Sequence, residues 1–259
     1  MVLRELSSAT LVAWGNAWLT GQAGLDDAVD TVEHGTGPHI LAAPDTGLVP
    51  GVTGEQPLRN ALADLRSHGI SALRLCLPVP GDPLGLVGEA ELNIAAIEAR
   101  EAVLVRMYDR QLGLVPAEDR RGSSYVGVRW TPYPATDTTP QIPSLPEAEQ
   151  QLTHAIRDCI PLFEQVTELA DWGPEVTAAL EDLRDPRQAP GDGLPPGSSQ
   201  RAHRVAALAE RLTVVVRLAD ADAGTGITTH QIATHATALR MLDRAVRRAR
   251  VAAYGAANQ

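Results

Sequence analysis

Residues 71–108 contain the clearest succession of structural elements in the chain. Residues 71–77 alternate leucine with smaller or polar residues, the period of two typical of a strand with two different faces. A loop rich in Gly and Pro ends this run, since proline cannot donate to a ladder. Residues 89–100 then show helical apolar spacing, and residues 102–108 form a second apolar run. Two strands joined through such a helix predict a right-handed parallel crossover.

Similar patterns on either side extend this unit into a sheet. A short apolar segment at residues 39–43 precedes a predicted helix at residues 56–68, which gives a second parallel crossover. Residues 111–115 and 125–131 alternate again and predict an antiparallel meander at the edge of the sheet. The predicted fold class is therefore α/β, with a mixed sheet.

The second half of the chain is helical. Three apolar series at four-three spacing, within residues 152–170, 205–219 and 232–253, predict a C-terminal antiparallel helical bundle. A shorter helix is expected at residues 174–183. Pro161 is expected to kink or break the first helix.

The domain boundaries follow from composition. Residues 1–135 form the predicted α/β domain, and the Pro/Thr-rich residues 136–146 form a linker. Residues 147–259 form the bundle, whose residues 185–199 have the composition of a mobile loop.

Charge and residue usage exclude several classes of protein. The formal net charge of -10 argues against general nucleic-acid binding, which depends on neutralising phosphates. All 22 basic residues are arginine, so no P-loop or Schiff-base lysine is available. Cys76 and Cys159 are expected to be buried thiols in a reducing compartment. The N-terminus lacks the pattern of a secretory signal and no run suits a membrane span, which predicts a cytoplasmic protein.

The predicted strand ends carry the first candidate site. Parallel strands place their carboxyl ends at one edge of a sheet, and here those ends carry Asp45, Asp82 and Asp109. Converging carboxylates could hold a divalent cation or act as an acid and base pair. The alternative is ordinary turn chemistry, because Asp beside Gly and Pro bonds nearby backbone N–H groups. A phosphate cradle is disfavoured, because acids lie where an anion would bind.

Arginines supply two further candidate surfaces. Arg74, Arg106 and Arg129 interrupt three strands and could form a cationic patch that binds a carboxylate or phosphate ligand. Pairing with acids of the covering helices is the alternative. The last helix carries a basic stripe whose members could dock to an acidic partner protein, a solvated face being the alternative. They are Arg240, Arg244, Arg247, Arg248 and Arg250.

Two remaining features have simple explanations and a sharper alternative each. His235 falls on an apolar seam, where a hydrogen-bonded structural role is expected. The alternative is that Cys159 meets His235 across the bundle and that the two form a metal or nucleophile site. Trp14 and Trp18 lie on one side of a short N-terminal helix, where burial against their own domain is expected and anchoring of a partner is the alternative.

The runs LPVPGDPLGLVG, ELNIAAIEAREAVLV and LVAWGNAWLTG resemble uncharacterised proteins of high-GC actinobacteria. This resemblance implies no activity. Because no complete set of nucleophile, base and orienting group can be assembled, the sequence favours a non-enzymatic interaction or regulatory protein that binds a protein partner or a second copy. The alternative is a small-molecule or metal-dependent enzyme that uses the strand-end acids.

Overall fold

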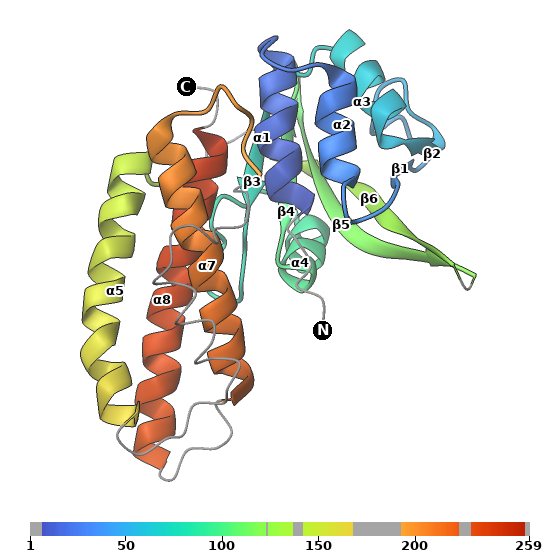
Figure 1. Cartoon of the computed structure of the whole chain (residues 1–259). Coiled ribbons are helices and arrows are strands. Elements are labelled where there is room, and N and C mark those ends of the chain that lie inside the picture. Colours follow the sequence, from blue (N-terminus) through green and yellow to red (C-terminus); the bar gives the residue numbers. More distant parts are fainter. Residues whose placement is uncertain (1–6, 123, 137–141, 168–192, 223–228, 257–259) are drawn as a thin grey trace. The chain divides into compact units, whose positions relative to one another are not determined.

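The computed structural model describes residues 7–122, 124–136, 142–167, 193–222 and 229–256, leaving aside the side chains of residues 160–167, 218–222, 229–232 and 235. The described residues form six strands and seven helices (Figure 1). The chain divides into two compact units. The first comprises Met1–Ile142, Gly193–Ser198 and Tyr254–Gln259, and the second comprises Pro143–Asp192 and Ser199–Ala253.

The first unit is built on one mixed six-stranded sheet of order β2-β1-β6-β5-β4-β3. Only β1 and β6 pair in parallel, and every other neighbouring pair is antiparallel. The mixed sheet predicted from the sequence is confirmed, but β3 to β6 form the antiparallel part at its centre and at one edge. The strands are β1 (His39–Ala43), β2 (Gly54–Pro57), β3 (Ala72–Cys76), β4 (Ala102–Arg106), β5 (Gln111–Arg121) and β6 (Tyr125–Ala135).

The two predicted parallel crossovers are wrong. β3 and β4 pair antiparallel, with Cys76 facing Ala102, so β4 begins beside the residue where β3 ends. The segment between them leaves and returns at the same end of the sheet, because its apolar loop residues Leu84 and Leu86 are buried and hold the loop on the sheet. β1 and β3 lie at separate positions in the sheet and run in opposite directions, which removes the other crossover.

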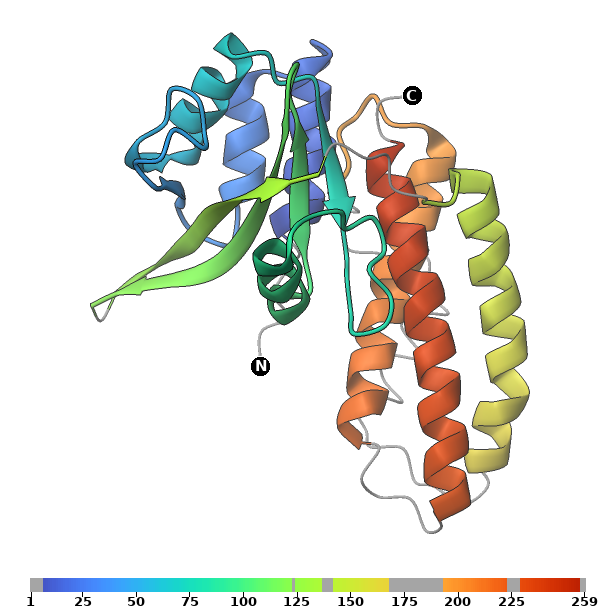
Figure 2. The same ribbon diagram turned by 180° about the vertical axis from the view of Figure 1, so that it is seen from behind.

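Helices cover both faces of this sheet (Figures 1 and 2). One face is covered by α1 (Ser7–Leu19), α2 (Leu25–Glu33) and α3 (Leu58–Ser67), of which α1 contacts β3 and β4 and α3 contacts β1 and β2. The other face packs against α4 (Ala90–Ala99) over β5 and β6. A buried cluster on that side joins Leu92 and Ala96 of α4 to Leu104 and Val115 of the sheet. The half of this face formed by β1, β2 and the far end of the β5–β6 hairpin carries Glu55, Asp119, Arg121 and Arg129.

α1 closes one edge of the sheet through Gly15 and Asn16. The Asn16 side chain donates from Nδ2 to the carbonyl oxygen of Leu73, 2.8 Å away, and accepts from the Leu73 N–H on Oδ1, also at 2.8 Å. Asn16 therefore occupies the hydrogen-bonding position of a neighbouring strand beside the edge strand β3. Gly15 permits this approach, because a Cβ at that position would collide with the Leu73 side chain.

Substituting Asn16 with alanine is expected to destabilise the first unit by about 2 kcal/mol, since the Leu73 N–H and C=O lose their partner. Urea denaturation followed by circular dichroism measures the change, and hydrogen exchange should show faster exchange of the Leu73 amide. The matched control is Thr20→Ala on the same helix, because the Thr20 hydroxyl donates only to α1 carbonyls. Equal stability of the two variants, with the Leu73 amide still protected, would contradict this role of Asn16.

Both tryptophans of α1 are used within the first unit. Trp18 is buried, and the Arg66 guanidinium lies 4.8 Å from its ring centroid. The Trp14 indole N–H donates to the Gly193 carbonyl at 2.8 Å. The expected burial of Trp18 against its own domain is confirmed, whereas Trp14 is half-buried and bonds Gly193, which lies outside the predicted domain of residues 1–135. The same contact, together with burial of Leu194, holds Gly193–Ser198, which lie in the predicted mobile loop, on the first unit; residues 185–192 of that loop lie outside the described residues.

The second unit contains α5 (Leu145–Thr167), α7 (Gln200–Asp222) and α8 (Thr229–Gly255). The Cys159 thiol of α5 donates to the Ala238 carbonyl of α8 at 3.4 Å. Arg250 of α8 pairs with Glu210 of α7 at 2.7 Å. Seam residues of α8 are buried as the four-three spacing predicts: Leu239, Leu242, Val246 and Ala249.

Two sequence expectations for the second unit differ in outcome. α5 continues through Pro161 to Thr167, so the predicted break in this helix does not occur. The short helix predicted at residues 174–183 lies outside the described residues. None of the helices in the described ranges combines the length and the apolar character needed to cross a membrane.

Candidate functional site

The β5–β6 hairpin extends beyond both strands that flank it. β5 and β6 pair from Gln111 and Ala135 at one end to Arg121 and Tyr125 at the other. β4 pairs only with the first four residues of β5, and β1 pairs only with residues 128–130 of β6. Beyond Leu114 the outer edge of β5 therefore has no neighbouring strand among the described residues, and beyond Glu118 and Val128 the hairpin has no third strand on either side. We call residues 116–122 and 124–126 the arm. The arm projects away from the helices of its unit (Figures 1 and 2).

The register shows which backbone groups of the arm point outward. The Val128 N–H donates to the Pro38 carbonyl at 3.0 Å, so the backbone groups of Val128 point away from β5. Val128 faces Glu118, and facing residues of an antiparallel pair share this orientation. The N–H and C=O of Glu118 therefore point to the outer edge of β5, as do those of Arg120 two residues on. Pro116, which has no N–H, occupies the same kind of position, where no ladder bond is lost.

The side chains along this outer edge carry both signs of charge. Glu118 and Arg120 share one face of β5, and the Arg120 Nε lies 2.6 Å from a Glu118 carboxylate oxygen. The Arg120 side chain is 72% exposed. Val126 faces Arg120 across the hairpin and is itself 47% exposed. The arm thus offers backbone groups, paired charges and one apolar side chain within a few residues.

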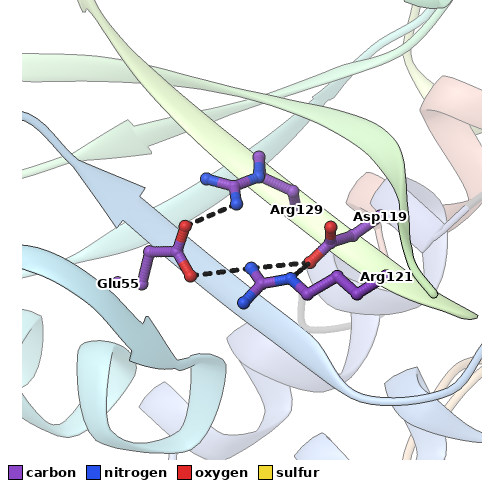
Figure 3. A network of polar contacts seen from close by, with 4 residues as sticks. All are labelled: Glu55, Asp119, Arg121 and Arg129. Atoms are coloured by element: carbon purple, nitrogen blue, oxygen red, sulfur yellow. Dashed lines mark hydrogen bonds and ion pairs between the residues drawn. The ribbon is translucent and has the colours of Figure 1, made fainter. Parts of the chain in front are cut away.

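Ion pairs on the opposite face hold the arm in place (Figure 3). Glu55 of β2 accepts from Arg129 of β6 on one carboxylate oxygen, at 2.5 Å, and from Arg121 of β5 on the other, at 2.7 Å. The Arg121 Nε also donates to Asp119 at 2.9 Å. Glu55 reaches across β1 to make these contacts, so a single carboxylate links three positions of the sheet.

The charges of this network reinforce one another. Hydrogen bonds from Arg121 and then from Arg129 lower the pKa of Glu55 below its ordinary value. Hydrogen bonds to Asp119 and then to Glu55 raise the pKa of Arg121. Glu55 and Arg121 therefore stay ionised at neutral pH.

The structure does not bring the strand-end acids together. β1 and β4 run in the same direction, so Asp45 and Asp109 follow strand ends on the same side of the sheet. Two strands, β6 and β5, lie between β1 and β4, so β1 and β4 are three strand spacings apart, about 14 Å. Asp82 follows β3, which runs the opposite way, and therefore lies at the other end of the sheet.

The surroundings of these acids fit turns rather than a shared site. Asp109 bonds with the adjacent Arg110 at 2.9 Å, and these hydrogen bonds lower the pKa of Asp109. The Asp82 N–H donates to the Val79 carbonyl in a tight turn. Within the described ranges no group of three or more His, Cys, Asp or Glu side chains could hold a metal ion. The predicted convergence is wrong because it depended on parallel strands.

The three strand arginines share one face of the sheet but do not form one patch. The register places Arg74, Arg106 and Arg129 on the same face. Arg129 is separated from β4 by β5 and is engaged by Glu55, whereas Arg74 is half-buried and Arg106 is exposed. Arg129 therefore belongs to the network at the base of the arm. Ligand binding by the other two stays a prediction.

The arginines of α8 have different environments. Arg250 is buried against Glu210, and the side chain of Arg247 is 11% exposed and pairs with Asp243 at 2.7 Å. Arg240 and Arg244 are exposed and Arg248 is half-buried. The stripe expected on one open face is therefore partly internal. Docking of a partner by its exposed members stays a prediction.

Both cysteines are free and buried. Burial raises the pKa of the Cys76 thiol to about 12, which keeps it protonated. Burial, and then the nearby Asp158 charge, raises the pKa of Cys159 as well. The side chain of His235 lies outside the described residues, so its predicted meeting with Cys159 is untested. Two thiols held in the neutral form are poor nucleophiles.

The predicted strands cover only part of the arm. They end at Val115 and begin again at Tyr125, whereas β5 continues through the charged run EDRR to Arg121. A signal was present in the prolines of β6. Pro132 and Pro134 are two residues apart, so both lie at positions of β6 where the backbone N–H would point away from β5. A proline at such a position removes no hydrogen bond between the two strands.

Comparison with known proteins identifies relatives along the whole chain. Residues 8–148 match the family model described as Rv1486c-like protein, N-terminal domain, and residues 146–251 match the corresponding C-terminal domain. An uncharacterized protein of Mycobacterium leprae (strain TN), ML1804, is 30% identical over 96% of each chain. The uncharacterized protein Rv1486c of Mycobacterium tuberculosis (strain ATCC 25618 / H37Rv) is 33% identical over 42% of this chain and 43% of its own length. No solved structure matches.

Proposed function

The chain belongs to the family of Rv1486c-like proteins, and we propose that it is a non-enzymatic interaction protein that binds a protein partner through the arm. The observation that carries this proposal is the outer edge of β5, where the Glu118 and Arg120 backbone groups point outward without a neighbouring strand in the described part of the chain. Such an edge pairs readily with an added strand.

The anchoring of the arm supports a role in binding. An isolated two-stranded ribbon is marginally stable in water, so a ribbon of this length needs support. Glu55 supplies that support through Arg121 and Arg129, on the face opposite Glu118 and Arg120. The arm is therefore pre-organised, which lowers the entropic cost of binding a partner.

The alternative of a small-molecule or metal-dependent enzyme has lost its supporting geometry. It required Asp45, Asp82 and Asp109 to share one edge of a parallel sheet, and the strand directions separate them. The free, buried Cys76 and Cys159 support a reducing compartment, so the proposed interaction takes place in the cytoplasm.

We also propose that the second unit is an antiparallel bundle. Its support is the course of the helices within this unit, where α8 runs opposite to α5 and α7 (Figures 1 and 2). Side-chain contacts join the helices: Glu149 with Arg201, Arg250 with Glu210, and Cys159 with the Ala238 carbonyl.

Photocrosslinking tests the proposed binding role of the arm. A benzophenone amino acid at Val126 in the full chain, expressed in a mycobacterial host, is expected to give one discrete protein adduct after irradiation. The matched control carries the same group at Ile94 on α4, which is 61% exposed and equally apolar. Mass spectrometry identifies the adduct. Absence of an adduct at Val126, or the same adducts at both positions, would argue against the arm as a binding element.

A further inference from the structure

We propose that the partner of the arm is a second copy of this chain, whose β5 edge pairs antiparallel with the first so that Glu118 faces the partner's Arg120. This inference rests on the proposed binding role of the arm. It identifies the class of partner and the register of the contact.

The outward backbone groups restrict the register. We consider two β5 edges related by a twofold axis perpendicular to the sheet. In this arrangement the two sheets form one continuous surface, and equivalent faces lie on the same side. The residues that exchange hydrogen bonds must then be those whose N–H and C=O point outward, namely Glu118 and Arg120. Three registers satisfy this condition: Glu118 facing its own copy, Arg120 facing its own copy, or Glu118 facing Arg120.

Charge selects one of these three registers. The first two place like charges directly opposite each other, which destabilises a strand pair. The second also brings Asp119 opposite the Arg121 of the second copy, but Asp119 is only 9% exposed and Arg121 is already engaged with Asp119 and Glu55 of its own copy. The third places Glu118 opposite the partner's Arg120 and, by symmetry, Arg120 opposite the partner's Glu118. The ion pair already present within each strand, at 2.6 Å, then becomes one side of a square of four alternating charges. The edge is therefore complementary to itself in this register.

The twofold axis of this register passes beside Asp119, which faces its own copy. This like-charge contact occurs once, whereas the pair of Glu118 and Arg120 is made twice, and each Asp119 is also bonded to the Arg121 of its own strand at 2.9 Å. The Asp119 backbone groups point toward β6, so this position contributes no hydrogen bond to the contact. At the ends of the contact, the Pro116 carbonyl faces Gly122 of the second copy and can accept from its N–H.

A second copy supplies both the backbone groups and the charges that the outer edge of β5 can pair with. The contact is isologous, so one pair of opposite charges is made twice. It is also short, with two pairs of hydrogen-bonded residues, and lies at the small end of specific interfaces. The expected species is therefore a dimer that depends on protein concentration and weakens as salt screens the exposed charges.

Charge reversal tests the register. Sedimentation of the full chain, whose mass is 27.5 kDa, is expected to show a monomer–dimer equilibrium that shifts to dimer with concentration. Glu118→Arg and Arg120→Glu each place like charges opposite each other twice, so each is expected to raise the dimer dissociation constant about tenfold or more. The double variant Glu118→Arg/Arg120→Glu restores opposite charges and is expected to restore the dimer. Circular dichroism verifies that every variant is folded.

Mixing the two single variants provides a second readout. In the mixed dimer every arginine at positions 118 and 120 faces a glutamate, so the mixture is expected to dimerise although each variant alone does so weakly. A chain that sediments as a monomer at all concentrations overturns the inference, as does a dimer unaffected by either reversal or a mixture that stays monomeric. An adduct of another protein at Val126 beside a monomeric chain would overturn the second copy and leave the binding role of the arm standing.

Discussion

Replacing Arg250 with methionine is expected to lower the free energy of unfolding of the second unit by about 3 kcal/mol, the lower end for a broken buried ion pair. The Arg250 side chain is 7% exposed, and its two hydrogen-bonded contacts to Glu210 are 2.7 and 2.8 Å long. Its removal deprives the Glu210 carboxylate of a buried cation. The low end applies because the Glu210 side chain is 23% exposed and keeps some contact with water.

A surface pair in the same unit supplies the control for Arg250. Arg201 bonds with Glu149 at 3.0 Å, but these side chains are 50% and 36% exposed. Arg201→Met is therefore expected to cost less than about 1 kcal/mol. The double variant Arg250→Met/Glu210→Leu removes both buried charges and is expected to recover most of the loss. Guanidinium denaturation of the full chain measures all three, and equal costs for the two Arg→Met variants would show that burial does not strengthen the Arg250 pair.

Gly127→Ala is expected to destabilise the first unit by roughly 3 kcal/mol, because its new Cβ would collide with the Pro38 carbonyl oxygen. That oxygen belongs to the backbone and accepts from the Val128 N–H at 3.0 Å, so it cannot move aside without loss of this bond. The same bond orients the edge of β5. The variant is therefore expected to lower the thermal midpoint of unfolding and to weaken dimerisation as well.

Gly122→Ala at the end of the hairpin is the matched control. Its φ of 66° is left-handed, but no atom lies within 4 Å of the added Cβ. We expect a cost of about 1 kcal/mol from the backbone conformation alone. Calorimetry of both variants separates collision from conformation. A Gly127→Ala variant as stable as Gly122→Ala would show that the Pro38 segment gives way easily.

The sequence predicts most elements of the fold but not their pairing. Residues 39–43 form β1 as expected, and the helix predicted at residues 89–100 is α4 (Ala90–Ala99). Alternation reveals that a segment is a strand, yet it carries no information on which strand lies beside it. The loop before α4 buries Leu84 and Leu86, and the chain returns to the end of the sheet that it left, so β3 and β4 pair antiparallel.

The candidate site was missed for a related reason. Pattern analysis places chemistry at the ends of parallel strands, and here the informative surface is the side of a strand. Neither Glu118 nor Arg120 is unusual as a residue. Their significance depends on β4 ending its pairing at Leu114, which no local feature of the sequence specifies. The short strand β2 was likewise missed: its last two residues, Gln56 and Pro57, belong to the helix predicted at residues 56–68, which begins at Leu58 in the structure.

The bond between Asn16 and Leu73 also bears on solubility. β3 is one terminal strand of the sheet, and an open terminal strand can pair with another chain and seed aggregation. Loosening of α1 would expose this edge, so partial unfolding at the start of the chain is a route to aggregation. Asn16 therefore blocks strand addition at β3 as well as stabilising the fold.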